Sequence, residues 1–128
     1  MERIMSLLSN TYGITTPDQH PARSISIAAQ NDVFRQTFDP DMGMVTMTPT
    51  VDALPDKTKH FLILEVQNYN DFRGDIYCEH DFGTIKLEGA TYYFKIDYYD
   101  KSYEKGSEDP ANPALTNRVL LIMARQDY

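Results

Sequence analysis

The side chains of this sequence that could do chemistry gather in its second half, where imidazole, carboxylate and phenol groups stand close together. His80 lies between Glu79 and Asp81, and further acids, beginning with Asp97, follow along the next predicted strand. Imidazole nitrogen and carboxylate oxygen are metal ligands, and a carboxylate can also orient a histidine as a general base. One hypothesis is therefore a small metal-assisted hydrolase that uses His80, Asp97 and nearby carboxylates.

The spacing of these residues does not favour that hypothesis. Successive side chains of a strand point to opposite faces, so Glu79 and Asp81 would point away from His80. The sequence has no metal-binding histidine or cysteine motif, no phosphate-binding glycine pattern and no nucleophile in a recognisable elbow. The alternative interpretation is a structural hydrogen bond between His80 and Asp97 that holds a hairpin. We therefore expect a protein that is not an enzyme and that carries no cofactor or metal.

Tyrosines and acids of the same region favour a binding surface. Tyr93 and Tyr99 are predicted on the face of the hairpin that also carries Asp97. Tyrosine beside carboxylate suits a protein interface, where an aromatic ring meets an arginine-rich surface. The alternatives are a solvated loop for the acids and a face covered by a helix for the tyrosines. The predicted partner-binding residues are Tyr93, Asp97, Tyr99, Asp100, Glu104, Glu108 and Asp109.

The charge of the chain indicates the chemistry of a partner. The net charge is −7, and residues 65–109 hold 11 of the 19 acids but only 5 of the 12 bases. Such a surface repels phosphates, so we expect a basic protein partner and no direct contact with nucleic acid. The most concrete hypothesis is a phage- or plasmid-type counter-defence protein, such as an anti-CRISPR or anti-restriction inhibitor. A homo-oligomer that hides the tyrosine face is the remaining alternative.

Length and cysteine content place the chain among cytoplasmic proteins. At 128 residues it can form one domain with a substantial core. Cys78 is the only cysteine, so a disulfide framework is excluded and a reducing compartment is favoured. The first residues lack the pattern of a signal peptide, and the longest apolar run, Val119–Ala124, is too short to cross a membrane.

The pattern of apolar residues predicts an α+β fold, an antiparallel sheet of about four strands with two helices packed on one face. We expect a flexible lead-in over residues 1–23 and a single domain over residues 24–128. A first helix over 25–38, capped by Ser24, would place Ile27, Asn31, Phe34 and Phe38 on one face. A second helix is expected to begin at Leu54-Pro55-Asp56, although Phe61–Val66 could instead form a strand.

The expected strands include a clear hairpin. Residues 82–87 and 90–98 alternate around Glu88-Gly89, a two-residue turn. A short strand is expected at 43–48. The last strand, 117–124, is apolar on both faces and is therefore expected at the centre of the sheet, covered on both sides. Arg118 is a candidate for an ion pair with Asp97 or Asp100.

Six blocks of the sequence follow one another in a recognisable order: Asn31–Phe38, Ala53–Pro55, Glu79–Gly83, Lys95–Asp100, Gly106–Pro110 and Arg118–Leu120. Together they resemble a small bacterial family of unknown function, DUF3768. The resemblance runs from about Asn31 to Tyr128, and no activity can be carried over from it. The family is common in bacterial chromosomes and on mobile elements, which implies an accessory role. An Asp-Pro pair usual in the family is replaced here by the stretch Asp75–Cys78.

Overall fold

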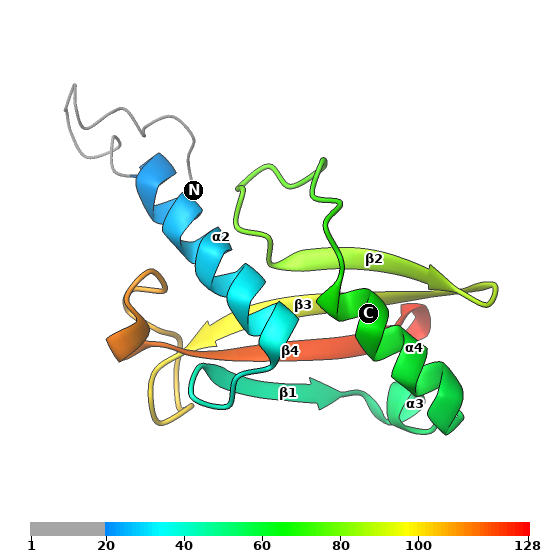
Figure 1. Cartoon of the computed structure of the whole chain (residues 1–128). Helices are drawn as coiled ribbons and strands as arrows, with labels where there is room; N and C mark the ends of the chain where they lie inside the picture. Colours follow the sequence, from blue (N-terminus) through cyan, green and yellow to red (C-terminus); the bar gives the residue numbers. More distant parts are fainter. Residues whose placement is uncertain (1–19) are drawn as a thin grey trace.

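The computed structural model, which describes residues 20–128, contains one mixed sheet with its main helices on one side (Figure 1). The strand order is β1-β4-β3-β2, and the strands span β1 Gly43–Met47, β2 Phe82–Leu87, β3 Ala90–Tyr99 and β4 Asn117–Ala124. The predicted α+β class and four strands are confirmed. One pairing differs from a purely antiparallel sheet, because β1 runs parallel to β4. None of the helices described in this chain is long and apolar enough to cross a membrane.

Helix α2 spans His20–Thr37 and begins earlier than predicted. Ser24 is therefore a buried residue inside the helix, and its predicted role as a cap is wrong. The predicted apolar face is confirmed, since Ile27, Asn31 and Phe34 are buried. Of the predicted lead-in, the part from His20 onward is helical, and residues 1–19 lie outside the described residues.

Two helices follow β1. Helix α3, Pro49–Asp52, was not predicted; Thr48 caps it by accepting a 3.4 Å hydrogen bond from the Val51 amide. Helix α4, Asp56–Gln67, confirms the predicted second helix and buries Leu62 and Val66 against the sheet. The alternative of a strand over Phe61–Val66 is therefore wrong.

The hairpin of β2 and β3 has the predicted turn. Glu88 and Gly89 both have positive φ, 53° and 82°, as a two-residue turn with the twist of a hairpin requires. The pairing of Ile85 with Tyr92 and of Thr84 with Tyr93 places alternate residues on opposite faces. Ile85 and Tyr92 are buried in the core, as predicted.

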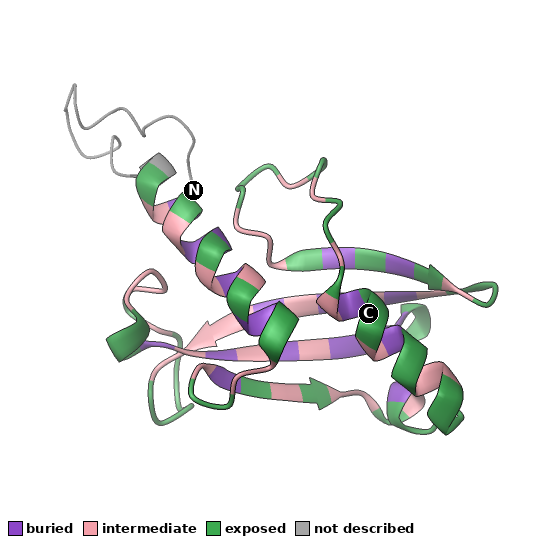
Figure 2. Cartoon of the chain, in the orientation of Figure 1, coloured by how far each residue is buried: buried purple, intermediate pink, exposed green. Residues whose placement is uncertain are grey.

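Buried residues alternate with less buried ones along β3 and β4, so the two faces of the sheet differ in their cover (Figure 2). Residues of α2 and α4 pack on one face, where Phe94, Leu120 and Ile122 are fully buried. The predicted central place of β4 is confirmed, but Val119 and Leu121 on its other face are only half-buried. Cover on both sides was expected because the sequence pattern is apolar throughout. In the structure neither α2 nor α4 lies on the second face, which is covered only in part: Met123 is buried there, but Val119 and Leu121 are not.

Candidate functional site

The loop 70–81 between α4 and β2 turns sharply before the hairpin begins. Cys78 and His80 have positive φ values of 56° and 58°, so the strand starts only at Phe82. This geometry turns the His80 imidazole toward helix α2, where Nδ1 lies 3.0 Å from Oδ1 of Asp32. The predicted contact between His80 and Asp97 is therefore wrong, because strand alternation does not extend back to His80. Asp97 instead forms an ion pair with Lys95, with Nζ 3.0 Å from Oδ2.

The His80–Asp32 pair is part of a clamp between the loop and the helix. The Phe72 ring stacks on the His80 ring, with centroids 4.0 Å apart and planes 3° apart. The buried Arg35 donates from NH1 to Oδ1 of Asp32 at 2.9 Å and lies over Phe72. A carboxylate that orients an imidazole could serve acid–base chemistry, but the other contacts of the pair are an aromatic ring and a guanidinium. Residues 20–128 contain no group of three side chains able to hold a metal ion.

A second, more deeply buried network lies beside this clamp. The Tyr98 hydroxyl donates to Oε1 of Glu79 at 2.9 Å and accepts from Nδ2 of Asn31 at 2.9 Å. Arg118 donates from Nε to Oδ1 of Asn31 at 2.6 Å and from NH2 to the Pro110 carbonyl at 2.9 Å. Burial, with the Glu79 charge, raises the pKa of Tyr98, so this phenol remains a hydrogen-bond donor.

Arg118 serves this network and not the acidic surface. Burial lowers the pKa of its guanidinium, while the neighbouring Tyr98 and Glu79 act in the opposite direction. The predicted ion pair with Asp97 or Asp100 is wrong, because the Arg118 side chain is almost fully buried beneath the sheet surface. The sequence blocks that contain Asn31, Glu79, Tyr98 and Arg118 are far apart in the chain, and they meet in this one hydrogen-bond network.

The predicted partner surface divides into two groups. Tyr93, Asp97 and Tyr99 alternate along β3 with the buried Phe94 and Ile96, so they lie on the sheet face opposite the helices. Their side chains are partly exposed, as the predicted outward face requires. Lys95, on the same face, neutralises the Asp97 charge locally. This group is therefore aromatic more than anionic.

The other predicted residues lie in the connection between β3 and β4. Glu104 and Glu108 are exposed, whereas Asp109 lies 3.4 Å from the Arg23 guanidinium. The Asp100 carboxylate accepts from the Glu104 amide and the Ser102 hydroxyl, each at 3.0 Å, and these bonds lower its pKa. Asp100 thus also shapes the loop that presents its neighbours.

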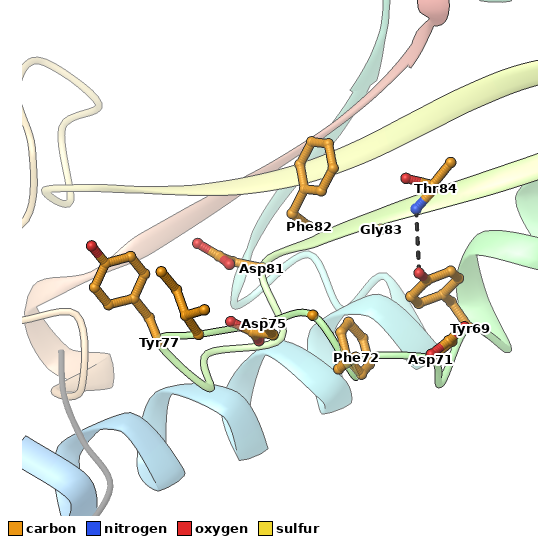
Figure 3. Close-up of a pocket in the computed structure, with 11 residues that line it drawn as sticks. Tyr69, Asp71, Phe72, Asp75, Tyr77, Asp81, Phe82, Gly83 and Thr84 are labelled. Carbon is orange, nitrogen blue, oxygen red and sulfur yellow. Dashed lines mark hydrogen bonds between the residues drawn. The ribbon is translucent and has the colours of Figure 1, made fainter.

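A cavity of about 360 Å³, which sequence reasoning missed, lies between loop 70–81 and the start of β2 (Figure 3). Burial and the charges of Glu79 and Asp75 raise the pKa of Asp81 to about 6. Carboxylates and aromatic rings intermixed over residues 69–82 were the available signal. The lining residues are Tyr69, Asp71, Phe72, Gly74, Asp75, Ile76, Tyr77, Asp81, Phe82, Gly83 and Thr84.

Phe82 joins this cavity to the uncovered sheet face. Its ring stacks on Tyr93 with centroids 5.5 Å apart, and Tyr128 lies 5.9 Å from Phe82 and 5.2 Å from Tyr93. Tyr128 and Phe82 are exposed, at 77% and 37%. The cavity and the aromatic part of the predicted surface are therefore continuous.

A family match spans residues 47–127, more than half of the chain, and the matching family is described as a protein of unknown function (DUF3768). The chain belongs to this family. The match begins after helix α2, later than the resemblance at Asn31 suggested, so Asn31 and Asp32 lie outside it. Comparison with curated proteins gave no match, and comparison with solved structures gave none.

Proposed function

We propose that this DUF3768 protein is a small acidic binding protein without catalytic activity and that it engages a basic protein partner. The observation that carries the proposal is the uncovered sheet face, where Tyr93, Asp97 and Tyr99 are partly exposed. A sheet normally covers an apolar face with another layer, and this face retains half-buried Val119 and Leu121. A partner would supply that layer.

The chemistry of the surface fits a protein interface. Phe82, Tyr93 and Tyr128 form an aromatic cluster, and aromatic residues are enriched in interface centres. Glu104 and Glu108 provide exposed negative charge in the connection beyond β3. Negative charge at the rim of an interface speeds association with a basic protein and selects against acidic ones.

The finer form of the proposal is a cytoplasmic inhibitor of a nucleic-acid-binding defence protein. A basic groove that normally holds a phosphate backbone would accept carboxylates in its place. The free thiol of the exposed Cys78 is compatible with a reducing compartment. An anti-CRISPR or anti-restriction activity of this kind would require no catalytic residue in this chain.

The test is capture of a partner from the native host with the full chain as bait, followed by mass spectrometry. We expect a basic protein, and the Glu104→Lys/Glu108→Lys variant should reduce its capture at least about tenfold. The matched control is Asp41→Lys/Glu65→Lys, which makes the same charge change at exposed positions on the loop after α2 and on helix α4. Equal capture by both folded variants would contradict the proposal, and so would a stable homodimer that buries the tyrosine face.

A further inference from the structure

We propose that the cavity between loop 70–81 and the start of β2 is a binding site for an arginine side chain of the protein partner. The inference rests on the proposed function for the source of that side chain. The cavity itself is a feature of this chain, with a volume of about 360 Å³. That volume is at the small end of ligand pockets and suits a side chain more than a large cofactor.

The charge of the lining selects a cation. Asp71, Asp75 and Asp81 line the cavity, and its lining contains no lysine, arginine or histidine. Asp71 is neutralised by the exposed Arg73, whose Nε lies 2.7 Å from its Oδ1. Asp75 and Asp81 therefore carry negative charge that no lining residue balances. An anion would be repelled from this cavity.

Among the carboxylates that line the cavity, that of Asp81 most clearly lacks a counter-ion. It is partly buried, and among residues 22–128 its carboxylate forms no ion pair and no hydrogen bond with another residue. The carboxylate of Asp75, by contrast, accepts a 2.7 Å hydrogen bond from the His80 amide, which fixes its position. Burial without a counter-ion raises the pKa of Asp81, and a guanidinium beside it would reverse that effect.

The aromatic walls favour a guanidinium over a compact ammonium. Tyr69 and Phe72 lie at one end of the cavity, and Tyr77, Asp75 and Asp81 lie at the other (Figure 3). A planar guanidinium can stack on an aromatic face while its N–H groups reach a carboxylate, which a lysine ammonium does less well. The end of the cavity with Tyr77 offers both partners to one side chain, whereas the Phe72 ring already stacks on His80.

The walls are held in place before any ligand binds. The Tyr69 ring makes edge contacts with Phe72 and Phe94, with centroids 5.1 Å and 5.2 Å away. Its hydroxyl accepts from the Thr84 amide at 3.3 Å, on the outer side of the edge strand β2. A preformed site avoids the entropic cost of ordering its walls on binding.

The position of the cavity agrees with a protein as the source of the arginine. Phe82 lines the cavity and also stacks on Tyr93 of the uncovered sheet face. A partner that covers this face would therefore pass the mouth of the cavity at the start of β2. One basic side chain on the covering surface of that partner could enter the cavity directly.

The direct test is an NMR titration of the full chain with the peptide acetyl-Gly-Arg-Gly-amide. We expect its addition to shift the amide signals of Gly74, Asp81, Gly83 and Thr84. The same peptide with citrulline, a neutral isostere of arginine, should not bind, and the lysine peptide should bind more weakly. Equal binding of the citrulline or lysine peptide would overturn the assignment to a guanidinium.

A variant pair separates the cavity from the general charge of the protein. Asp81→Asn should weaken the arginine peptide at least about tenfold, as expected for loss of a charged hydrogen-bond partner. Asp41→Asn makes the same change at an exposed, distant position and should leave affinity unchanged. Retained affinity in a folded Asp81→Asn variant would overturn the inference.

The inference and the proposed function can fail separately. If capture of the native partner depends on Glu104 and Glu108 but not on Asp81, the cavity inference fails and the proposed function stands. If the arginine peptide binds at the cavity but the host yields no basic partner, the proposed function fails and the arginine site stands.

Discussion

The imidazole Nδ1 atom of His80 lies 3.0 Å from Oδ1 of Asp32, so helix α2 holds a loop that is distant in the sequence. The Phe72 ring stacks on the same imidazole and also lines the cavity. The contact therefore connects the helix to one wall of the proposed binding site. Because loop 70–81 has no regular secondary structure, its shape depends on side-chain contacts of this kind.

His80→Ala should loosen loop 70–81, because it removes both the contact with Asp32 and the stack on Phe72. We expect faster hydrogen exchange over residues 74–81 and a loss of about 1–2 kcal/mol in the free energy of unfolding. Cys78→Ala is a matched control, since its φ of 56° is close to the 58° of His80 and its side chain is exposed. Equal exchange in both variants would show that the imidazole does not hold the loop.

Tyr98→Phe tests the buried network. The substitution removes one hydroxyl and leaves Oε1 of Glu79 and Nδ2 of Asn31 each without one hydrogen bond. We expect a loss of about 1–2 kcal/mol, measured by urea unfolding. Tyr99→Phe, one residue further on the uncovered face, should change stability by less than about 0.5 kcal/mol. A Tyr98→Phe variant as stable as the wild type would refute a structural role for the hydroxyl.

Gly83→Ala tests why a glycine stands at the start of β2. A Cβ atom at this position would overlap the Phe94 and Tyr69 rings, both of which pack in or beside the core. We expect destabilisation of about 1–3 kcal/mol from overpacking, measured by thermal unfolding. Gly74→Ala in loop 70–81 is the control, because a Cβ there meets no atom within 4 Å. Comparable stability of the two variants would mean that the rings move aside.

The elements that local pattern determines could be predicted from the sequence. Alternation around Glu88-Gly89 predicts the hairpin, but the register depends on whether these two residues form the turn, because the turn length fixes which residues pair. The structure has this turn and the pairing that follows from it. The run 117–124 predicts a central strand, because its residues are apolar on both faces of the strand. Parallel pairing of β1 with β4 is a long-range relationship, and no local pattern encodes it.

The candidate site was less predictable because its geometry depends on exceptions to local rules. Alternation predicted that His80 faces Asp97, but the positive φ at His80 directs the ring to Asp32 on another element. Non-glycine residues seldom adopt this conformation, so sequence reasoning had no ground to expect it. The acids lining the cavity all lie in loop 70–81, and the turns of this irregular loop, which no periodic pattern encodes, bring Asp75 and Asp81 together.

Asp81→Asn should make the protein more stable at neutral pH and flatten its dependence on pH. The pKa of Asp81 is about 6 in the folded protein, raised by burial and then by the charges of Glu79, Asp75 and, more weakly, Asp97. In the unfolded chain an aspartate has a pKa near 3.9. Between about pH 4 and pH 6 the folded state therefore binds more protons, and stability falls as the pH rises through this window.

Asparagine keeps the shape of the carboxyl group without its charge, so the loss of stability on raising the pH should be absent from the variant. Because Asp81 keeps some contact with solvent, we expect the variant to be more stable than the wild type by about 1–2 kcal/mol at pH 7.5, after allowance for screening. The two proteins should converge near pH 4. Urea unfolding at about pH 4, 5, 6 and 7.5 measures this difference, because these pH settings span the pKa values of Asp81 in the folded and unfolded states. A difference that does not grow with pH would refute an uncompensated charge at Asp81.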